Sequence, residues 1–329
     1  MLRLAIIGTN WITHKFVEAA LSTGLYQLKA IYSRNKDSAE TFASKYPSEN
    51  SQLFSDLDSL ASSNSFDAVY IASPNSLHAK QAMLFMNHGK HVIVEKPMAS
   101  NYIEAIQMFE CAKRNQVILF EAFKTAYTPN FSILKSELHS LGKIRLANLN
   151  FCQYSSRYPR YLAGELPNTF NPVFSNGSLM DIGFYCVAFA ITLWGKPNHV
   201  VGQAIKLDTG VDGLGTATLA FDDFLVNIQH SKISNSYVPS EIQGELGSLV
   251  IEHLSECESI TKIMRNTNKT QLISNRHPDN TMIFEASYFS ELVANKHINH
   301  DDILRSLTTI EVITALREQI GVTYQADQN

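Results

Sequence analysis

Short apolar runs alternate with amphipathic segments over the first third of the chain. Each run is rich in branched residues and stops at a polar or glycine-containing turn, as buried strands of a parallel sheet do. The predicted strands cover residues 2–7, 27–32, the vicinity of 54, 66–72, 90–94 and 116–122, and the predicted helices cover 14–22, 38–45, 57–61, 74–87 and 102–115. This alternation predicts an α/β fold, namely a Rossmann-type doubly wound parallel sheet.

The pattern changes after residue 122, where strand-like runs follow one another without helices between them. A helix or turn is expected at 128–139, then a half-buried strand at 143–154, an irregular stretch at 154–176, a helix at 177–195, strands between 200 and 274, and closing helices at 282–295 and 302–319. Such a succession predicts an α+β domain with an open, mostly antiparallel sheet. We therefore expect two domains, a Rossmann-type domain at 1–122 and an α+β domain at 123–329.

A glycine turn separates the first predicted strand from the first helix. Strand, glycine turn and helix form the phosphate-binding opening of a dinucleotide fold, with the spacing G-x-G-x-x-G/A. Only Gly8 fits that spacing, because Asn10 and Thr13 hold the other two places. Asparagine adopts a positive φ more readily than most residues, so we expect Asn10 to make the turn in that conformation. A strand, turn and helix without any ligand is the alternative.

The second predicted strand ends at Ser33 and Arg34, and no acidic residue occurs between Gln27 and Lys36. An NAD site commonly places a carboxylate here to hold the ribose 2′-hydroxyl, whereas an arginine accommodates a 2′-phosphate. Ser33 can donate to that phosphate and Arg34 can face it. These residues favour NADP(H) over NAD(H), and a solvated polar turn is the alternative.

The sequence Glu95-Lys96-Pro97 ends another buried strand. Proline lacks an N–H and holds the preceding residue extended, so Lys96 is fixed at the carboxyl edge of the sheet, where ligands bind. An ammonium there can stabilise negative charge on a substrate oxygen. A solvated lysine before a tight turn is the alternative reading.

Asn75 and His78 open the helix after the strand at 66–72. Asn75 is placed to line the nicotinamide end or to cap the helix. Asp181 and Tyr185 are four residues apart, which puts them on one face of an α-helix. Tyr185 could exchange a proton with a reacting hydroxyl while Asp181 orients its neighbours. A core tyrosine and a first-turn aspartate that favours the helix dipole are the alternatives.

Several of these motifs, in this order, resemble the glucose–fructose oxidoreductase, inositol dehydrogenase and rhizopine-catabolism (Gfo/Idh/MocA) family. They are Gly8-Thr9-Asn10-Trp11-Ile12, Ser73-Pro74-Asn75 with His78, Glu95-Lys96-Pro97, Phe120-Glu121-Ala122 and Gly177 to Tyr185. The arrangement of Lys96, Asp181 and Tyr185 is most similar to the dihydrodiol and xylose dehydrogenase branch. The resemblance covers essentially the whole chain.

The resemblance implies two sets of site residues. The catalytic set is Lys96, Asp181 and Tyr185, and the cofactor-binding set is Gly8, Thr9, Asn10, Trp11, Ile12, Ser33, Arg34, Ser73, Pro74, Asn75, His78, Glu95 and Lys96. Lys124 and Ala126 depart from the aromatic residue and arginine of the dihydrodiol branch, so the substrate is not carried over from it. Lys124, Tyr127 and Arg157 are the candidate substrate contacts, and the stretch 154–176 is interpreted as a substrate-side flap or an oligomer contact.

The composition limits the kinds of partner that this protein is expected to bind. Hydrophobic residues make up 45% and charged residues 18% of the chain, and the net charge is -4 without a basic stripe, so nucleic acid is a poor partner. The four cysteines lack metal-ligand spacing and suit reduced thiols in the cytoplasm, and no metal site is expected. No signal peptide is evident, and the apolar runs fall short of a membrane span.

Together these features predict an NAD(P)-dependent oxidoreductase that transfers a hydride between nicotinamide and a carbinol carbon of a sugar, polyol or cyclic diol. Lys96 and Tyr185 would manage the proton and the oxyanion. Two alternatives remain open: a non-catalytic nucleotide-binding regulator on the same fold, or a reductase of another substrate class such as an imine or a bilin. Apolar residues alternating on the open sheet favour a homodimer or homotetramer formed through it.

Overall fold

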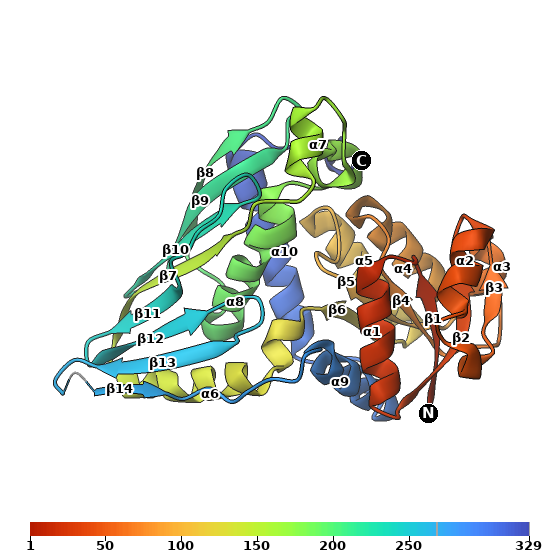
Figure 1. The fold of residues 1–329 in the computed structure, drawn as a ribbon, viewed down its shortest axis with the longest axis horizontal. Helices are drawn as coiled ribbons and strands as arrows, with labels where there is room; N and C mark the ends of the chain where they lie inside the picture. The colour runs from red at the N-terminus through yellow and green to blue at the C-terminus, as the bar shows by residue number, and fades with distance from the viewer. Residues whose placement is uncertain (268, 329) are drawn as a thin grey trace. The chain divides into compact units, whose positions relative to one another are not determined.

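The computed structural model describes residues 1–267 and 269–328, which form two compact units (Figure 1). The first unit comprises 1–122 and 279–304, and the second comprises 123–278 and 305–329. The strands are β1 (Leu2–Ile7), β2 (Tyr26–Tyr32), β3 (Gln52–Phe54), β4 (Ala68–Ile71), β5 (His91–Glu95), β6 (Leu119–Ala122), β7 (Ile144–Cys152), β8 (His199–Lys206), β9 (Asp212–Ala220), β10 (Leu225–Ser231), β11 (Ser240–Gly244), β12 (Gly247–Glu252), β13 (Ser259–Met264) and β14 (Lys269–Leu272). The α-helices are α1 (Trp11–Ser22), α2 (Lys36–Ala43), α3 (Leu57–Ala61), α4 (His78–Asn87), α5 (Tyr102–Asn115), α6 (Pro129–Glu137), α7 (Tyr158–Leu162), α8 (Phe184–Trp194), α9 (Met282–Ala294) and α10 (Asp302–Gln319).

The first unit is built on a six-stranded parallel sheet in the order β3-β2-β1-β4-β5-β6. All four residues of β4 are buried, because helices cover both faces of such a sheet and its central strands never meet water. Phe16 of α1 stacks on Tyr70 of β4 with ring centroids 3.9 Å apart. The predicted doubly wound parallel fold is confirmed.

Residues 279–304 return to this first unit, although they follow the second unit's sheet in sequence. The predicted division had grouped them with 123–329. Helix α9 packs along α1, and the Tyr26 hydroxyl donates to the Ala286 carbonyl at 2.5 Å. Asn280 Nδ2 donates to the Lys15 carbonyl at 2.7 Å. The return is driven by the apolar face of α9, which buries Met282, Ala286 and Phe289.

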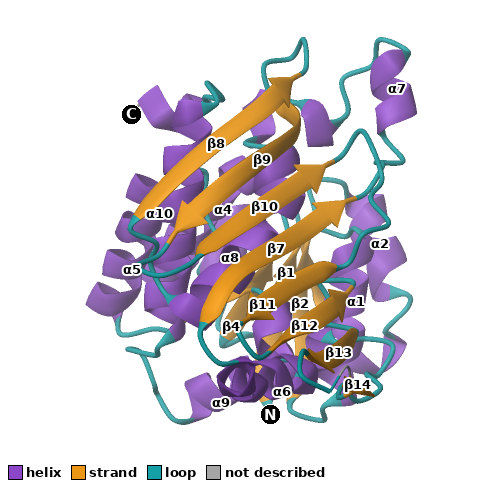
Figure 2. Ribbon diagram, turned by 90° about the vertical axis from the view of Figure 1, so that its left-hand side faces the viewer, coloured by secondary structure: helices purple, strands orange, loops and turns teal. Residues whose placement is uncertain are grey.

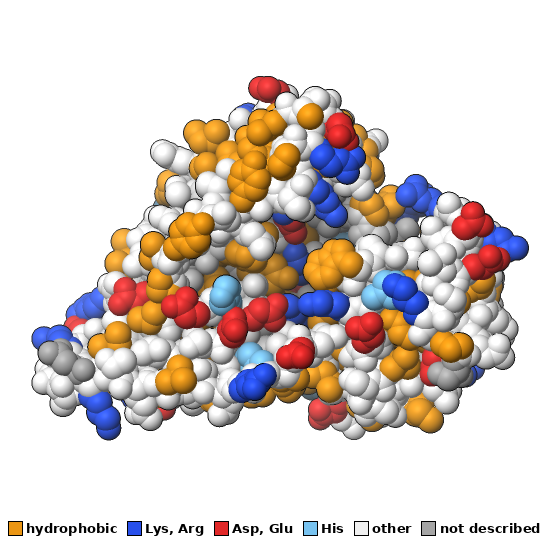
Figure 3. All heavy atoms as spheres, in the orientation of Figure 1, with side chains coloured by type: hydrophobic (Ala, Val, Ile, Leu, Met, Phe, Trp, Pro, Cys, Tyr) orange, Lys and Arg blue, Asp and Glu red, His pale blue; other side chains and the backbone are white. Residues whose placement is uncertain are grey.

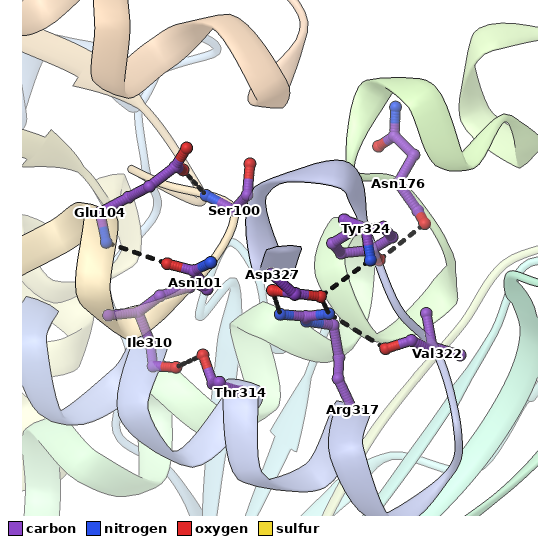
Figure 4. Close-up of polar contacts among 10 residues, drawn as sticks. All are labelled: Ser100, Asn101, Glu104, Asn176, Ile310, Thr314, Arg317, Val322, Tyr324 and Asp327. Carbon is purple, nitrogen blue, oxygen red and sulfur yellow. Dashed lines mark hydrogen bonds and ion pairs between the residues drawn. The ribbon is translucent and has the colours of Figure 1, made fainter. Parts of the chain in front are cut away.

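Helix α5 has the bounds predicted from its periodicity, and its start shows why (Figure 4). Asn101 Oδ1 accepts the Glu104 N–H at 2.9 Å, and Glu104 Oε2 accepts the Ser100 N–H at 2.9 Å. This reciprocal cap satisfies donors that the first helical turn leaves without partners.

The second unit is built on an eight-stranded sheet in the order β14-β13-β12-β11-β7-β10-β9-β8. Its neighbours pair antiparallel except β7 and β10, which pair parallel, so the predicted open, mostly antiparallel sheet is confirmed. Helix α8 packs on one face, against β7 and β10. The opposite face looks toward the viewer in Figure 2, and no helix of the described residues crosses it there.

The segment predicted as one helix over 177–195 begins with a π-helical turn, Leu179–Gly183. The Phe184 N–H reaches the Leu179 carbonyl, five residues back. The face shared by Asp181 and Tyr185 was predicted from α-helical periodicity, which the π-helical turn interrupts.

The stretch 154–176 was predicted to be irregular, but it contains α7 and two 3₁₀ turns, Asn168–Phe170 and Pro172–Phe174. Prolines begin these elements, and stacked rings fill them, with Tyr158 and Tyr161 centroids 5.7 Å apart. The helical stretch Pro172–Trp194 is long and apolar enough to cross a membrane, contrary to the expectation from the apolar runs, and 72% of its most apolar window is buried inside the protein, as in a core helix.

The end of α10 is held by the residues that follow it (Figure 4). The buried Arg317 guanidinium pairs with Asp327 at 2.8 Å and lies 4.3 Å from the Tyr324 ring centroid. The Tyr324 hydroxyl donates to the Asn176 carbonyl at 2.8 Å. The segment before the π-helical turn is thereby tied to the last residues of the second unit.

Candidate active site

The carboxyl ends of β1 and β4 lie next to each other at the point where the strand order of the first sheet reverses. In open α/β sheets, ligands bind in the crevice at such a point. The loops that follow β1, β2, β4 and β5 carry the predicted cofactor-binding residues, so the fold gathers these loops along one edge.

Gly8 makes the turn after β1, with φ +96°. A Cβ added there would lie 2.9 Å from the Ala72 carbonyl oxygen, so the β1 and β4 loops approach too closely for any side chain. The prediction of a positive φ at Asn10 is wrong, because its φ is -87°. Asn10 instead caps α1: its Oδ1 accepts from Ile12 and Thr13 N–H groups, and its Nδ2 donates to the Ala72 carbonyl at 3.0 Å. At the position of the second fingerprint glycine, the Asn10 side chain thus folds into the loop and completes the turn.

These features fit the pyrophosphate of a dinucleotide. A helix N-terminus facing a tight glycine turn attracts anions through its N–H groups and dipole. Asn10 occupies two of those N–H groups, whereas the Trp11 N–H donates to no atom among residues 1–267 and 269–328. Thr13, fully buried, turns its hydroxyl toward Asn10 Oδ1 at 3.3 Å. Its predicted contact with phosphate stays a prediction.

The loop after β2 presents an exposed Arg34 beside a half-buried Ser33. Burial raises the pKa of Tyr32, the last residue of β2, while the Arg34 charge lowers it and Asp56 raises it further. Asp56 follows β3 and had not been predicted to take part. Its carboxylate caps α3 by accepting the Ser59 N–H at 2.7 Å. Hydrogen bonding to the Ser59 side chain, and then to its N–H, lowers the pKa of Asp56.

Two buried side chains join the loops farther along the edge. His78, fully buried, places Nδ1 2.9 Å from the Pro97 carbonyl and Nε2 2.8 Å from the Ser73 carbonyl. Burial lowers the pKa of His78, which favours the neutral ring. Glu121 of β6 accepts the Met98 N–H at 2.9 Å. With Asn10, they form three edge ties, which we define as Asn10, His78 and Glu121.

Lys96 is half-buried and directly precedes Pro97 and Met98, whose backbone groups contact His78 and Glu121. The preceding Glu95 accepts a hydrogen bond from the Tyr70 hydroxyl at 2.5 Å, and the Lys96–Pro97 peptide bond is cis. The structure therefore places Lys96 at the carboxyl end of β5, in the loop where the sequence had placed it. Its role as a catalytic group stays a prediction.

Asp181 and Tyr185 belong to the second unit. Asp181 lies in the π-helical turn, and Lys232, which follows β10, forms an ion pair with it. The Tyr185 ring, half-buried at the start of α8, packs edge-on against Phe151 with centroids 5.5 Å apart. The sequence analysis missed Lys232, because its partner is 51 residues away and no local pattern relates the two.

The three candidate substrate contacts also lie in the second unit, each with a partner of its own. Lys124 forms an ion pair with Glu256. The Tyr127 hydroxyl accepts from Arg305 at 2.9 Å, and Arg157 donates to the Thr169 hydroxyl at 2.7 Å. The predicted substrate contacts would have to form beside these existing interactions.

A cavity of about 330 Å³ opens within the second unit, at the ends of β7 and β12. Phe151, the ring partner of Tyr185, is part of its wall. The wall consists of Asn150, Phe151, Cys152, Gln153, Ser236, Tyr237, Val238, Pro239, Ser240, Ile251, Glu252, His253, Leu254 and Ser255. Lysine and arginine are absent from that wall, and its polar side chains are mainly amides and hydroxyls. Figure 3 shows acidic and basic side chains interspersed over the face in view.

No group of three His, Cys, Asp or Glu side chains is arranged for a metal ion in the part of the chain that the structure describes. The fold and the edge geometry define a dinucleotide-binding α/β protein with a second, sheet-based domain.

Comparison with known proteins places it more narrowly. Residues 2–123 match the oxidoreductase family with an NAD-binding Rossmann fold, and residues 137–250 match the GFO/IDH/MocA C-terminal domain. The chain is 51% identical over 327 residues to the uncharacterized oxidoreductase YgjR of Escherichia coli (strain K12), covering 99% of each. It is 46% identical over 330 residues to scyllo-inositol 2-dehydrogenase (NADP(+)) IolU of Bacillus subtilis (strain 168), covering 100% of each. The chain therefore belongs to the GFO/IDH/MocA family of oxidoreductases.

More distant relatives and solved structures agree with this family and fold. Trans-1,2-dihydrobenzene-1,2-diol dehydrogenase of Danio rerio is 28% identical over 347 residues, covering 99% of each chain. The crystal structure of KijD10, a 3-ketoreductase from Actinomadura kijaniata in complex with NADP and TDP-benzene, shares the fold with a TM-score of 0.86 at 20% identity, covering 98% of this chain and 99% of the other. The resemblance inferred from the motifs is confirmed.

Proposed function

We propose that the protein is an NADP-dependent dehydrogenase that oxidises a carbinol of a polyol or sugar, or reduces the corresponding carbonyl. The geometry at the carboxyl ends of β1 and β4 carries this proposal, since Gly8 lets the two loops meet and α1 begins beside them. When bound, the nicotinamide supplies the hydride chemistry. The chain supplies binding, orientation and proton transfer.

The proposed roles divide between the two units. Lys96, at the end of β5, stabilises the alkoxide oxygen as the carbinol loses its hydride. Tyr185 takes the hydroxyl proton in oxidation and returns it in reduction. Asp181 orients the reacting groups as a carboxylate. Asp181 already forms an ion pair with Lys232 in the second unit.

Selection of NADP(H) over NAD(H) is proposed to rest on Ser33 and Arg34. The exposed guanidinium of Arg34 stands at the end of β2, where a 2′-phosphate would be held. The acid that raises the pKa of Tyr32 is Asp56, whose carboxylate is engaged in capping α3. The name of the relative IolU, an NADP(+) enzyme, supports the same choice.

The substrate is proposed to be an uncharged cyclic polyol or sugar, with scyllo-inositol as the first compound to try. The cavity lined in part by Phe151, the ring partner of Tyr185, supports this class, because its wall offers amides and hydroxyls but no lysine or arginine for a phosphate or carboxylate. Glu252 in that wall would repel an anionic substrate further. The substrate in the name of IolU belongs to the proposed class.

Assembly and location are proposed as well. The outer face of the eight-stranded sheet exposes Val201 and Ile205 on β8 and Leu225 on β10, which favours a homodimer or homotetramer formed through that sheet. All four cysteines are described, and all are free thiols. Free thiols favour the reducing cytoplasm.

Replacing Lys96 by methionine tests the function. We expect the rate of scyllo-inositol oxidation with NADP⁺ to fall by roughly 10²–10⁴-fold, the usual effect of losing one charge-stabilising or proton-transferring group. Affinity for NADPH, followed by tryptophan fluorescence, should stay within about threefold, which is roughly half of the 1.4 kcal/mol that a tenfold change represents.

Normal oxidation of scyllo-inositol by Lys96→Met enzyme would overturn the catalytic role of Lys96. Wild-type protein that reduces an imine or a bilin and leaves polyols and sugars unoxidised would favour a reductase of another class. Wild-type protein that binds NADPH but oxidises no polyol or sugar would favour the regulatory alternative.

A further inference from the structure

Three side chains from one hairpin hold the π-helical turn that carries Asp181. The hairpin is formed by β9 and β10, whose open ends lie next to each other. We define the π-turn anchor as Asp212 at the start of β9, His230 near the end of β10, and Lys232 directly after β10. Each of the three contacts a different residue of the segment 178–181.

One of these contacts is made to the backbone of the turn, and a second to the Ser178 hydroxyl just before it. Asp212 Oδ2 accepts the Leu179 N–H at 2.6 Å, and both groups are buried. His230 Nδ1 lies 2.9 Å from the Ser178 hydroxyl. Burial lowers the pKa of His230 to about 3, so its ring is neutral and its 3.8 Å approach to Asp212 is not an ion pair.

The third contact joins Lys232 to the side chain of Asp181 in the turn. Lys232 is 8% exposed, and its own N–H is held by the Gly213 carbonyl at 2.9 Å. Its ammonium pairs with the Asp181 carboxylate, whose side chain is 33% exposed. A buried, backbone-anchored cation thus meets a carboxylate that still faces solvent. Such a pair orients the exposed partner more than it stabilises the fold, because desolvation offsets much of the Coulombic gain.

We propose that Lys232 is a positioning residue of the active site, whose ammonium holds the Asp181 carboxylate in one orientation toward the reacting groups. This inference rests on the role given to Asp181 in the proposed function. Lys232 acts through Asp181 and need not touch the substrate. A carboxylate displaced by about 1 Å from its working position costs on the order of 10²-fold in rate, which sets the size of the expected effect.

A double-mutant cycle on the full chain tests the inference, with scyllo-inositol and NADP⁺ as the assay pair. The variants are Lys232→Met, Asp181→Asn and the double variant. If Lys232 works through Asp181, each single variant lowers kcat by roughly tenfold to a hundredfold, and the double variant is no slower than Asp181→Asn. NADPH affinity stays unchanged, so the loss appears in kcat and not in cofactor binding.

Two further variants separate positioning from structure. Lys232→Arg keeps the charge and should retain most of kcat, which also keeps the test usable if Lys232→Met does not fold. Lys262→Met is the matched control, since Lys262 forms a comparably buried ion pair with Glu137 at 2.7 Å elsewhere in the same unit. It should change the midpoint of unfolding without changing kcat.

The outcomes distinguish the two proposals. Two results would overturn the role of Lys232 and leave that of Asp181 intact. In the first, the losses of kcat in the two single variants multiply in the double variant. In the second, Lys232→Met has wild-type kcat while Asp181→Asn is slow. Wild-type kcat in Asp181→Asn overturns the role of Asp181 in the proposed function, and the role of Lys232 with it.

Discussion

Substitution of Gly8 by alanine should damage both the stability of the first unit and its affinity for NADPH. An L-residue at φ +96° is strained, and left-handed conformations cost roughly 1–2 kcal/mol. The new Cβ would also lie 2.9 Å from the Ala72 carbonyl oxygen, which is backbone and has no side-chain rotamer to change. Overpacking of this kind adds about 1–3 kcal/mol.

The chain offers a control substitution that causes the backbone strain without the overpacking. Gly24 has φ +69°, and a Cβ added there meets nothing within 4 Å. Gly24→Ala should therefore lose only the roughly 1–2 kcal/mol of backbone strain. The difference between the two variants isolates the close approach of the β1 and β4 loops.

Urea unfolding followed by circular dichroism measures the stability loss, and quenching of Trp11 fluorescence measures NADPH binding. Ala72 also accepts the Asn10 side chain, so moving its carbonyl disturbs the phosphate turn directly. We expect Gly8→Ala to bind NADPH at least about tenfold more weakly, a loss of 1.4 kcal/mol, and Gly24→Ala to bind as the wild type does. Equal stability losses in the two variants, with NADPH affinity intact in both, would refute the reasoning.

Three more predictions concern single side chains. Arg34→Ala should weaken NADPH by about tenfold or more, the value of a charge-assisted hydrogen bond, and leave NADH within threefold; equal weakening in parallel titrations would count against a 2′-phosphate contact. Tyr185→Phe should lower kcat by roughly 10²–10⁴-fold at unchanged NADPH affinity, and a normal rate would move the proton transfer elsewhere. Burial raises the pKa of Asp212 from 3.8 to about 6, so its stabilising contribution is present below pH 3.8 and is lost as the pH rises through about 6. In urea unfolding at several pH values, wild type should lose about 3 kcal/mol relative to Asp212→Asn across that window, at 1.36 kcal/mol per pKa unit, and parallel profiles would exclude the titration.

The parallel sheet could be predicted because its signals are local. Buried strands such as β4 read as unbroken apolar runs, and α5 begins with a reciprocal cap that is visible in the sequence from Ser100 to Glu104. Each of these depends on residues within a few positions of one another. The order of the loops along the edge then follows from the fold.

The conformation of Asn10 was mispredicted because two devices can complete the same turn. Gly8 alone takes the positive φ, which leaves Asn10 extended and able to cap α1. The sequence shows an asparagine where the fingerprint has a glycine, and both uses are ordinary for that residue. Only the carbonyl of Ala72, 62 residues away, decides between them by accepting the side-chain amide.

Long-range partners account for the rest of what the sequence left undecided. Lys232 lies 51 residues from Asp181, and α9 returns to α1 from the far end of the chain. The sequence does not predict the π-helical turn either, because its apolar residues continue the periodicity of α8 closely enough to look α-helical. Tertiary contacts at Ser178, Leu179 and Asp181 hold it in place.

The two halves of the proposed site are each organised internally, and this organisation predicts how defects should separate. In the first unit, the edge ties join the loops of β1, β4, β5 and β6 through Asn10, His78 and Glu121. In the second unit, the π-turn anchor joins a hairpin to the segment that carries Asp181. Losing an edge tie should therefore appear mainly in NADPH affinity, and losing a member of the anchor mainly in kcat. A substitution in either group that lowered NADPH affinity and kcat equally would show that the two halves are coupled more strongly than their separate hydrogen-bond networks imply.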